Sequence, residues 1–250
     1  MKQLKFLSTL GIACVFLFSS CGGNEEKTTE NTTATDSTAT TATDSTAAAP
    51  APTASINTTP ENIMVIRHKV ADFAKWKIAY DGHDSARLAN GIHNYVIGRG
   101  VNDSNMVMVA LKVDDTAKAK AFGKDPSLKA AMHKGGVIGA PTMSLNTVVY
   151  QDMSENMSSL RSMTNFTVKD WNAWKTAFDS NQQLRADNGI VTRAYGYDAN
   201  DNHKVTLVTA ITDTAKANAF WKSDVLKQKR AESGVVGEVK RFVYNVVQKY

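Results

Sequence analysis

One predicted helix carries aromatic and titratable side chains that share a single face. Projected at about 100° per residue, Trp76, Tyr80, His83 and Arg87 fall within about 60° of one another. An imidazole and a guanidinium among aromatic rings could orient a small ligand that is otherwise apolar. The sequence therefore predicts a ligand-binding site at these four residues. The alternative is that the aromatic side chains belong to the core and that Arg87 bonds helix-end carbonyls or a buried carboxylate.

This helix belongs to the first of two copies of one unit. Adding 98 to a residue number in 70–139 leads to its counterpart in 168–237, and roughly two positions in five are identical without a gap. The first copy is predicted to span residues 61–152 and the second residues 158–250. Counterparts on the first helix are Phe73 and Trp171, Trp76 and Trp174, Tyr80 and Phe178, His83 and Asn181, Arg87 and Arg185, and Asn90 and Asn188.

Each copy is expected to fold as strand, helix, strand, strand, helix, strand. Asp72 is a good N-cap for a helix that ends at Asn90, where Gly91 can adopt the left-handed conformation. Pro126 is expected to break or kink the second helix, which Asp115 begins. The strands of the first copy are predicted at residues 63–69, 92–99, 106–113 and 142–150. This order is typical of the ferredoxin-like α+β fold.

Two motifs within the copies resemble a known superfamily. A helix start of the form Asp-Phe/Trp-x-x-Trp-Lys occurs at Asp72 and Asp170, and Lys-Ala-x-Ala-Phe occurs at 118–122 and 216–220. Together with the element order, they resemble the dimeric α+β barrel superfamily, which includes antibiotic biosynthesis monooxygenase-like domains. The resemblance implies that the two copies form one pseudo-dimeric α+β barrel within a monomeric chain, with any ligand held between helix and sheet. The superfamily includes oxygenases, haem-handling enzymes and modules without known activity.

Histidines are unevenly distributed between the copies. The first copy contains His68, His83, His93 and His133, whose counterparts are Phe166, Asn181, Val191 and Ala231. Imidazole chemistry at these positions is therefore restricted to the first copy, and the second is expected to bind a ligand more weakly. Scattered surface histidines would give the same count. His133 is similar in place to the ligand of the haem-degrading branch but is one position out of register, so no cofactor is expected.

Several other kinds of site are excluded. Both cysteines, Cys14 and Cys21, precede the repeats, which leaves no thiol nucleophile or thiolate metal site there. Residues 198–202 begin like a calcium loop but lack its turn glycine and final glutamate, so a turn is expected and no metal. The net charge of +5 without an aromatic and basic stripe does not favour nucleic acid as a partner. Lys77 and Asp81 are expected to form a surface pair.

The amino end has the features of an export signal. Residues 1–20 place Lys2 and Lys5 before an apolar run that is too short to span a membrane. Ser19 and Ser20 before Cys21 resemble the lipobox of bacterial lipoproteins, which implies a lipid such as palmitate on Cys21. Gly22 after the cysteine favours an outer-membrane lipoprotein facing the periplasm or the cell surface. The alternative is an ordinary signal peptide with an incidental cysteine.

Residues 21–60 are predicted to be a disordered tether. They are rich in Thr, Ala and Ser and show no apolar periodicity. Asp36-Ser37-Thr38 and Asp44-Ser45-Thr46 resemble O-glycosylation sites of the Bacteroidetes, and a plain soluble spacer fits equally well. The expected protein is thus a membrane-anchored barrel that binds a small apolar or anionic ligand. The alternatives are a cofactor-independent oxygenase with His83 or His68 as its base, and a structural envelope protein with a filled core.

Overall fold

The computed structural model describes residues 56–155 and 157–250. The predicted signal peptide, Cys21 and the tether up to residue 55 lie outside the described residues. Within the described part of the chain, no helix is long and apolar enough to cross a membrane.

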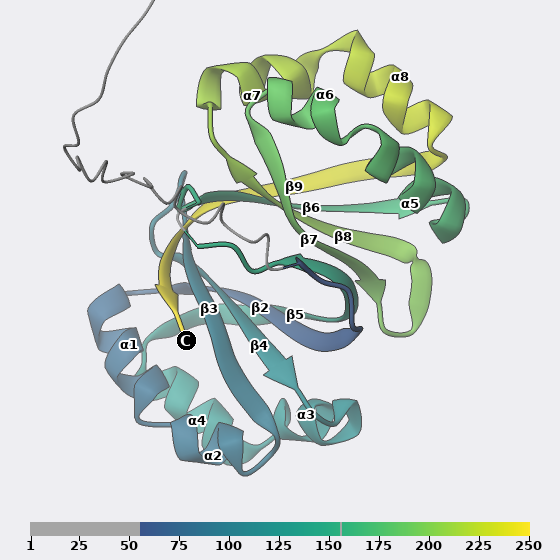
Figure 1. The fold of residues 1–250 in the computed structure, drawn as a ribbon. Helices are drawn as coiled ribbons and strands as arrows, with labels where there is room; N and C mark the ends of the chain where they lie inside the picture. Colours follow the sequence, from purple (N-terminus) through teal and green to yellow (C-terminus); the bar gives the residue numbers. More distant parts are fainter. Residues whose placement is uncertain (1–55, 156) are drawn as a thin grey trace, which may run out of the picture. The chain divides into compact units, whose positions relative to one another are not determined.

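Both copies, called the first and second repeats below, fold in the predicted element order, with each predicted helix divided in two. After a short strand, β1 (Ile56–Asn57), the first repeat contains β2 (Glu61–Val70), α1 (Phe73–Asp81), α2 (Asp84–Leu88), β3 (Ile92–Gly100), β4 (Met106–Val113), α3 (Thr116–Phe122), α4 (Pro126–Lys134) and β5 (Val137–Asp152). The second repeat contains β6 (Leu160–Val168), α5 (Trp171–Ser180), α6 (Gln182–Asp187), β7 (Ile190–Asp198), β8 (Asp201–Ile211), α7 (Thr214–Lys222), α8 (Asp224–Glu232) and β9 (Val235–Lys249). Each repeat carries its helices on the outer side of its strands (Figure 1).

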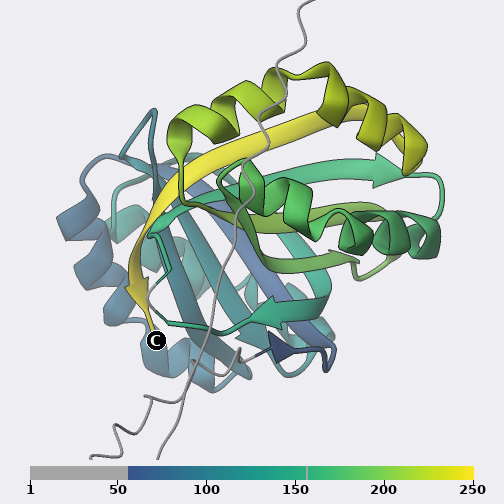
Figure 2. The same ribbon diagram turned by 45° about the horizontal axis from the view of Figure 1, so that its top comes forward.

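Two seams join the repeats into a closed barrel. At one seam β3 pairs with β9, and at the other β5 pairs with β7, both antiparallel. The strand order β5-β2-β4-β3-β9-β6-β8-β7 therefore returns to β5. Figure 2 shows β9, in yellow, running from the second repeat across to the first. The predicted α+β fold, with two ferredoxin-like units in one pseudo-dimeric barrel, is confirmed.

The helix ends follow from local side-chain chemistry. Asp72 accepts a hydrogen bond from the backbone N–H of Lys75, and its counterpart Asp170 accepts one from Ala173, which satisfies donors that have no partner inside the helix. Gly91 has φ +65° at the predicted left-handed position after the helix. Pro126 begins α4, where its missing N–H costs nothing.

The prediction of one continuous helix from Asp72 to Asn90 is wrong, because this segment forms two helices. The structure ends α1 at Asp81 and begins α2 at Asp84, with Gly82 and His83 between them. Glycine is a weak helix former, which accounts for the break in the first repeat. In the second repeat Asn181 donates its side-chain amide to the Ala177 carbonyl at 2.6 Å, a local bond that competes with helix continuation.

The predicted tether also extends too far. Ile56 and Asn57 pair with Asp152 and Gln151 at the end of β5. β5 pairs with β2 as far as Val148, so its last residues leave backbone groups free on that side. An extended segment can satisfy those groups whatever its composition, because the pairing uses the backbone.

The barrel interior is apolar and takes side chains from both repeats. These are Ile63, Val65, Met108, Ala110, Val148, Met163 and Tyr244. Their neighbours along each strand point outward and form separate cores with the helices, as the two-residue period of a strand requires. The interior also encloses a cavity of about 330 Å³, where Arg193 pairs with Asp152 at 3.0 Å.

Candidate functional site

A cavity of about 240 Å³ lies between the helices of the first repeat and the outer face of its sheet. α1 supplies Trp76 and Tyr80, the break after α1 supplies His83, and α2 supplies Arg87. The four residues predicted to form a ligand site therefore line one cavity, although the helix between them is broken. β2 contributes His68 from the opposite wall.

Aromatic rings form one side of this cavity. Trp76 stacks on Tyr80 with ring centroids 4.9 Å apart, and His68 lies 5.5 Å from Trp76. The Tyr80 hydroxyl donates a hydrogen bond to Asn94 on β3, which fixes the ring against the sheet. Burial raises the pKa of Tyr80, so this hydroxyl stays protonated at neutral pH. Rings held in this way present a rigid apolar surface to a ligand.

Arg87 is held by its own helix and by an aromatic ring. Its side chain is 3% exposed, and its guanidinium lies 3.8 Å from the centroid of the Tyr80 ring. One terminal nitrogen donates to Asp84 at 3.1 Å. Its Nε is buried and has no hydrogen-bond partner among the described residues. Arg87 therefore combines an ion pair within its own helix with one donor that has no partner among the described residues.

His68 is the most unusual polar group of the cavity. It is 7% exposed, and neither ring nitrogen has a hydrogen-bond partner in the part of the chain that the structure describes. Burial lowers the pKa of His68 to about 4, so the imidazole is neutral at pH 7. A neutral imidazole offers one donor and one acceptor. Buried polar groups nearly always find a hydrogen-bond partner, so these two nitrogens are exceptions within the described residues.

The other histidines differ in their surroundings. His83 approaches Ser127 with its Nε2 at 3.4 Å and lies 5.8 Å from the Phe122 ring, while its Nδ1 is buried without a partner among the described residues. His93 pairs with Asp114 at 2.8 Å, away from the cavity, and His133 is exposed. The interpretation of scattered surface histidines therefore holds for these last two residues and not for His68 or His83.

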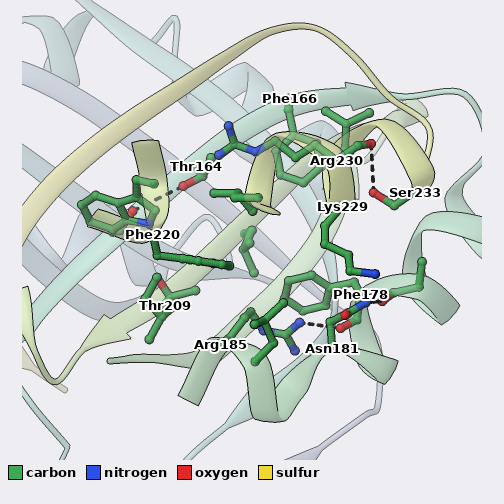
Figure 3. A pocket seen from close by; sticks show the side chains of 18 of the residues that line it. Thr164, Phe166, Phe178, Asn181, Arg185, Thr209, Phe220, Lys229, Arg230 and Ser233 are labelled. Carbon is green, nitrogen blue, oxygen red and sulfur yellow. Dashed lines mark hydrogen bonds between the residues drawn. The ribbon is translucent and has the colours of Figure 1, made fainter. Parts of the chain in front are cut away.

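The second repeat has the equivalent cavity, reduced to about 110 Å³. Two substitutions fill it, because Phe166 occupies the place of His68 and Trp221 that of Gly123. Figure 3 shows Phe166, Phe178 and Phe220 around this smaller cavity. Arg185 stacks on Phe178 at 3.6 Å, as Arg87 does on Tyr80, and donates a hydrogen bond to the Phe178 carbonyl. The paired arginines are thus a shared feature of both repeats.

Sequence reasoning missed the basic residues of the second cavity. Lys229, Arg230 and Arg241 line it, on α8 and β9. The corresponding residues of the first repeat are Ala131, Met132 and Met143. The sequence contains a signal for this difference, because the offset of 98 pairs each of these three cationic residues with a neutral residue of the first repeat. The helix projection considered only the first helix of each copy and not the second helix or the closing strand.

Other predicted features fall outside the cavities. Lys77 donates to Asp81 at 2.7 Å and Lys175 to Asp179 at 2.7 Å, which confirms the predicted surface pair. Ala199 and Asn200 form the predicted turn between β7 and β8. Among the described residues, no group of three or more His, Cys, Asp or Glu side chains could hold a metal ion.

Comparisons with known proteins give the class of fold. An anthrone oxidase-like protein has a TM-score of 0.53 and 13% sequence identity, over 78% of this chain and 95% of that chain. A proposed monooxygenase from Fusobacterium nucleatum subsp. nucleatum has a TM-score of 0.50 and 13% identity, over 76% of this chain and 93% of that chain. The sequence matches no protein-family model and is not significantly similar to any curated protein sequence.

These likenesses support the architecture that the strand pairing shows. The described part of the chain has the fold known as the dimeric α+β barrel, and here two ferredoxin-like units of one polypeptide form it. At 13% identity they establish the fold alone, because one fold carries many activities.

Proposed function

We propose that the cavity of the first repeat binds a small, largely apolar ligand that carries a polar or anionic group. The observation that carries this proposal is the pair of unpartnered nitrogens on the buried His68 ring. A ligand carboxylate or hydroxyl oxygen would accept a hydrogen bond from the protonated ring nitrogen of His68, and a ligand hydroxyl would donate one to the other ring nitrogen. The free Nε of Arg87 would add a charged donor. The apolar walls would take the rest of the molecule.

The size of the cavity supports binding over a purely structural role. About 240 Å³ of space under α1 and α2 is large for a domain interior, where voids above the size of a water molecule are few. A filled core would have argued for a structural envelope protein. In the second repeat, Phe166 and Trp221 reduce the equivalent space to less than half of this volume.

The alternative function is a cofactor-independent monooxygenase at the same cavity. A neutral imidazole beside an apolar pocket could act as a general base, and the two structural relatives named above are described as oxidising enzymes. The pKa of about 4 makes His68 a weak base, however, which favours binding over proton abstraction. Oxygen uptake with an anthrone as probe substrate tests this alternative, and uptake lost in His68→Phe would favour the enzyme.

The binding proposal is tested on the full chain purified from its own cell envelope. Native mass spectrometry should detect a small molecule that travels with the wild-type protein. The variant His68→Phe, which installs the residue of the second repeat, should lose at least nine-tenths of this bound mass. Arg87→Ala should lose more of it than Arg185→Ala, because only Arg87 shares a cavity with His83.

Two results would count against this site. A wild-type protein without any bound small molecule would leave His68 as a strained core residue. Equal retention in His68→Phe and wild type would place the ligand elsewhere. His133→Ala serves as the control, since His133 is exposed and outside the cavity.

We also propose that a lipid on Cys21 anchors the barrel to the outer membrane. The support is the sequence of residues 1–21, with its charged start, short apolar run and small residues before the cysteine. The lipid would hold Cys21 at the membrane, and the Thr-, Ala- and Ser-rich residues that follow it would separate it from the barrel. Cys21→Ser should release the protein from the membrane fraction into the soluble fraction, as measured by fractionation and blotting. Unchanged membrane association would overturn this proposal.

A further inference from the structure

The second-repeat cavity differs from the first most strongly in charge. Arg230 and Arg241 stand where the first repeat has Met132 and Met143. Both cavities keep one buried arginine, which is Arg185 in the second repeat. Two methionine positions of an apolar cavity are thus occupied by guanidinium groups in its counterpart.

The new charges are not neutralised within the fold. None of the residues that line this cavity is acidic. Lys229 pairs with Glu232 at 3.0 Å, and Asp179 lies near enough to stabilise the charge of Arg185. In the described part of the chain neither Arg230 nor Arg241 has a carboxylate within ion-pair distance.

Arg241 is the better defined of the two. Its guanidinium lies 4.0 Å from the centroid of the Trp221 ring, which fixes its plane. Its Nε is buried and has no hydrogen-bond partner among the described residues. Burial and the neighbouring charge of Arg230 lower the pKa of Arg241 to about 10, so it stays charged at neutral pH. Two like charges held together in a partly buried place are unfavourable until an anion joins them.

A second, open cavity adjoins this one and is also basic. This open cavity shares Trp221, Arg230 and Val235 with the second-repeat cavity, and its lining also includes Lys222 and Lys227. None of the residues that line it is acidic either. The basic surface therefore continues from the enclosed space to the outside, past Arg230.

We propose that the second-repeat cavity binds an oxyanion group, a carboxylate or a phosphate, through Arg230 and Arg241. Guanidinium groups present paired donors that match the oxygen spacing of these anions. Phe166, Trp174 and Phe178 also line the cavity and would contact the apolar portion of the ligand. Figure 3 shows Arg230 and Phe166 on the same side of this space, opposite Arg185. This site is separate from the first-repeat cavity, so it goes beyond the function proposed above.

The enclosed volume limits the size of the group. About 110 Å³ accommodates a phosphate or a short carboxylate, and the adjoining basic cavity offers a path for a larger body. The two sources of an oxyanion can be told apart with two probes, inorganic phosphate and butyrate, because only butyrate brings an apolar chain to the aromatic residues.

Titration of the full chain with each probe, followed by calorimetry and Trp fluorescence, tests the proposal. The matched variant Arg230→Met/Arg241→Met installs the residues of the first repeat and should weaken binding at least tenfold. Arg241→Lys keeps the charge but loses the paired donors and should give an intermediate affinity. The control Lys129→Met/Lys134→Met removes the same charge from exposed positions of α4 and should bind like wild type.

Every outcome decides for or against the site. Binding of phosphate, of butyrate or of both that is lost in the arginine variant and kept in the lysine control supports it, and the preferred probe identifies the anion. Failure of both probes to bind wild type overturns it, as does equal binding by the arginine variant. A thermal melt guards against misfolding, since phosphate or butyrate should raise the melting temperature of wild type and not that of the folded variant.

Discussion

At the scale of single residues, the burial of His68 makes the stability of the folded protein depend on pH. Its pKa is lowered from 6.5 to about 4 because desolvation penalises the charged ring. Between these values the unfolded chain binds a proton that the folded protein does not. The contribution of His68 to the free energy of unfolding is therefore complete above about pH 6.5 and is lost as the pH falls toward 4.

We predict that His68→Phe removes most of this pH dependence. Wild type should lose on the order of 3 kcal/mol of unfolding free energy between pH 7 and pH 4 through this residue, since each pKa unit corresponds to about 1.4 kcal/mol. Urea denaturation at both pH values measures the difference. His133→Phe is the control, because it makes the same substitution at an exposed histidine. Parallel losses in wild type and His68→Phe would show that other groups dominate.

The residues of the first-repeat cavity differ in how far the sequence could predict them. Trp76, Tyr80, His83 and Arg87 were predicted to lie together because residues three and four apart share a helix face, and they do line one cavity. His68 lies on β2, and no local period connects a strand residue to a helix face. Its lack of a partner is a property of the packed structure and is not visible in the sequence.

At the scale of elements, two equivalent glycines allow the seams to form. A Cβ at Gly98 would lie 2.3 Å from Cδ2 of Tyr244, and a Cβ at Gly196 would lie 2.2 Å from the carbonyl oxygen of Thr147. Gly98 pairs with Val246 on β9, and Gly196 pairs with Val148 on β5. Each seam therefore depends on one position without a side chain.

We predict that Gly196→Ala destabilises the barrel more than Gly98→Ala. The obstacle at Gly196 is backbone, which cannot move aside, whereas at Gly98 it is the Tyr244 ring. Overpacking of this kind costs about 1–3 kcal/mol, with Gly196→Ala at the upper end. Thermal and urea unfolding measure both variants. Gly123→Ala is the control, since Gly123 has a helical φ of −58° and its Cβ would approach no atom closer than 3.4 Å.

The element order was predictable because its signals are local. Asp72 and Asp115 at the starts of the two predicted helices, Gly91 after the first and Pro126 inside the second mark boundaries that the structure reproduces. The helix break at Gly82 and the pairing of Ile56 with β5 were not predicted. The break depends on a small difference in helix propensity, and the pairing depends on a free strand edge that is distant in the sequence.

At the scale of the whole molecule, the second repeat takes the place of a partner subunit. Both open edges of the first-repeat sheet, β3 and β5, are covered by strands of the second repeat. Covered edges remove the template for association with another chain, which is why we expect the folded part to be monomeric.

We predict that residues 61–152 expressed alone are unstable or self-associate. The isolated repeat would expose β3, β5 and the apolar side chains of the barrel interior, among them Val65 and Met108. Size-exclusion chromatography with light scattering measures its mass, and residues 61–250 provide the monomeric control. A stable monomer of the single repeat would contradict the prediction.

Completion of the barrel depends on β9, which is the last strand of the second repeat. β9 pairs with β3 of the first repeat and with β6 of its own, and it is formed by residues Val235–Lys249. The ring therefore cannot close until β9 has been synthesised, which happens after all the other strands of the two repeats. A chain truncated before Val235 would lack this strand and would leave β3 and β6 each without a partner along one edge.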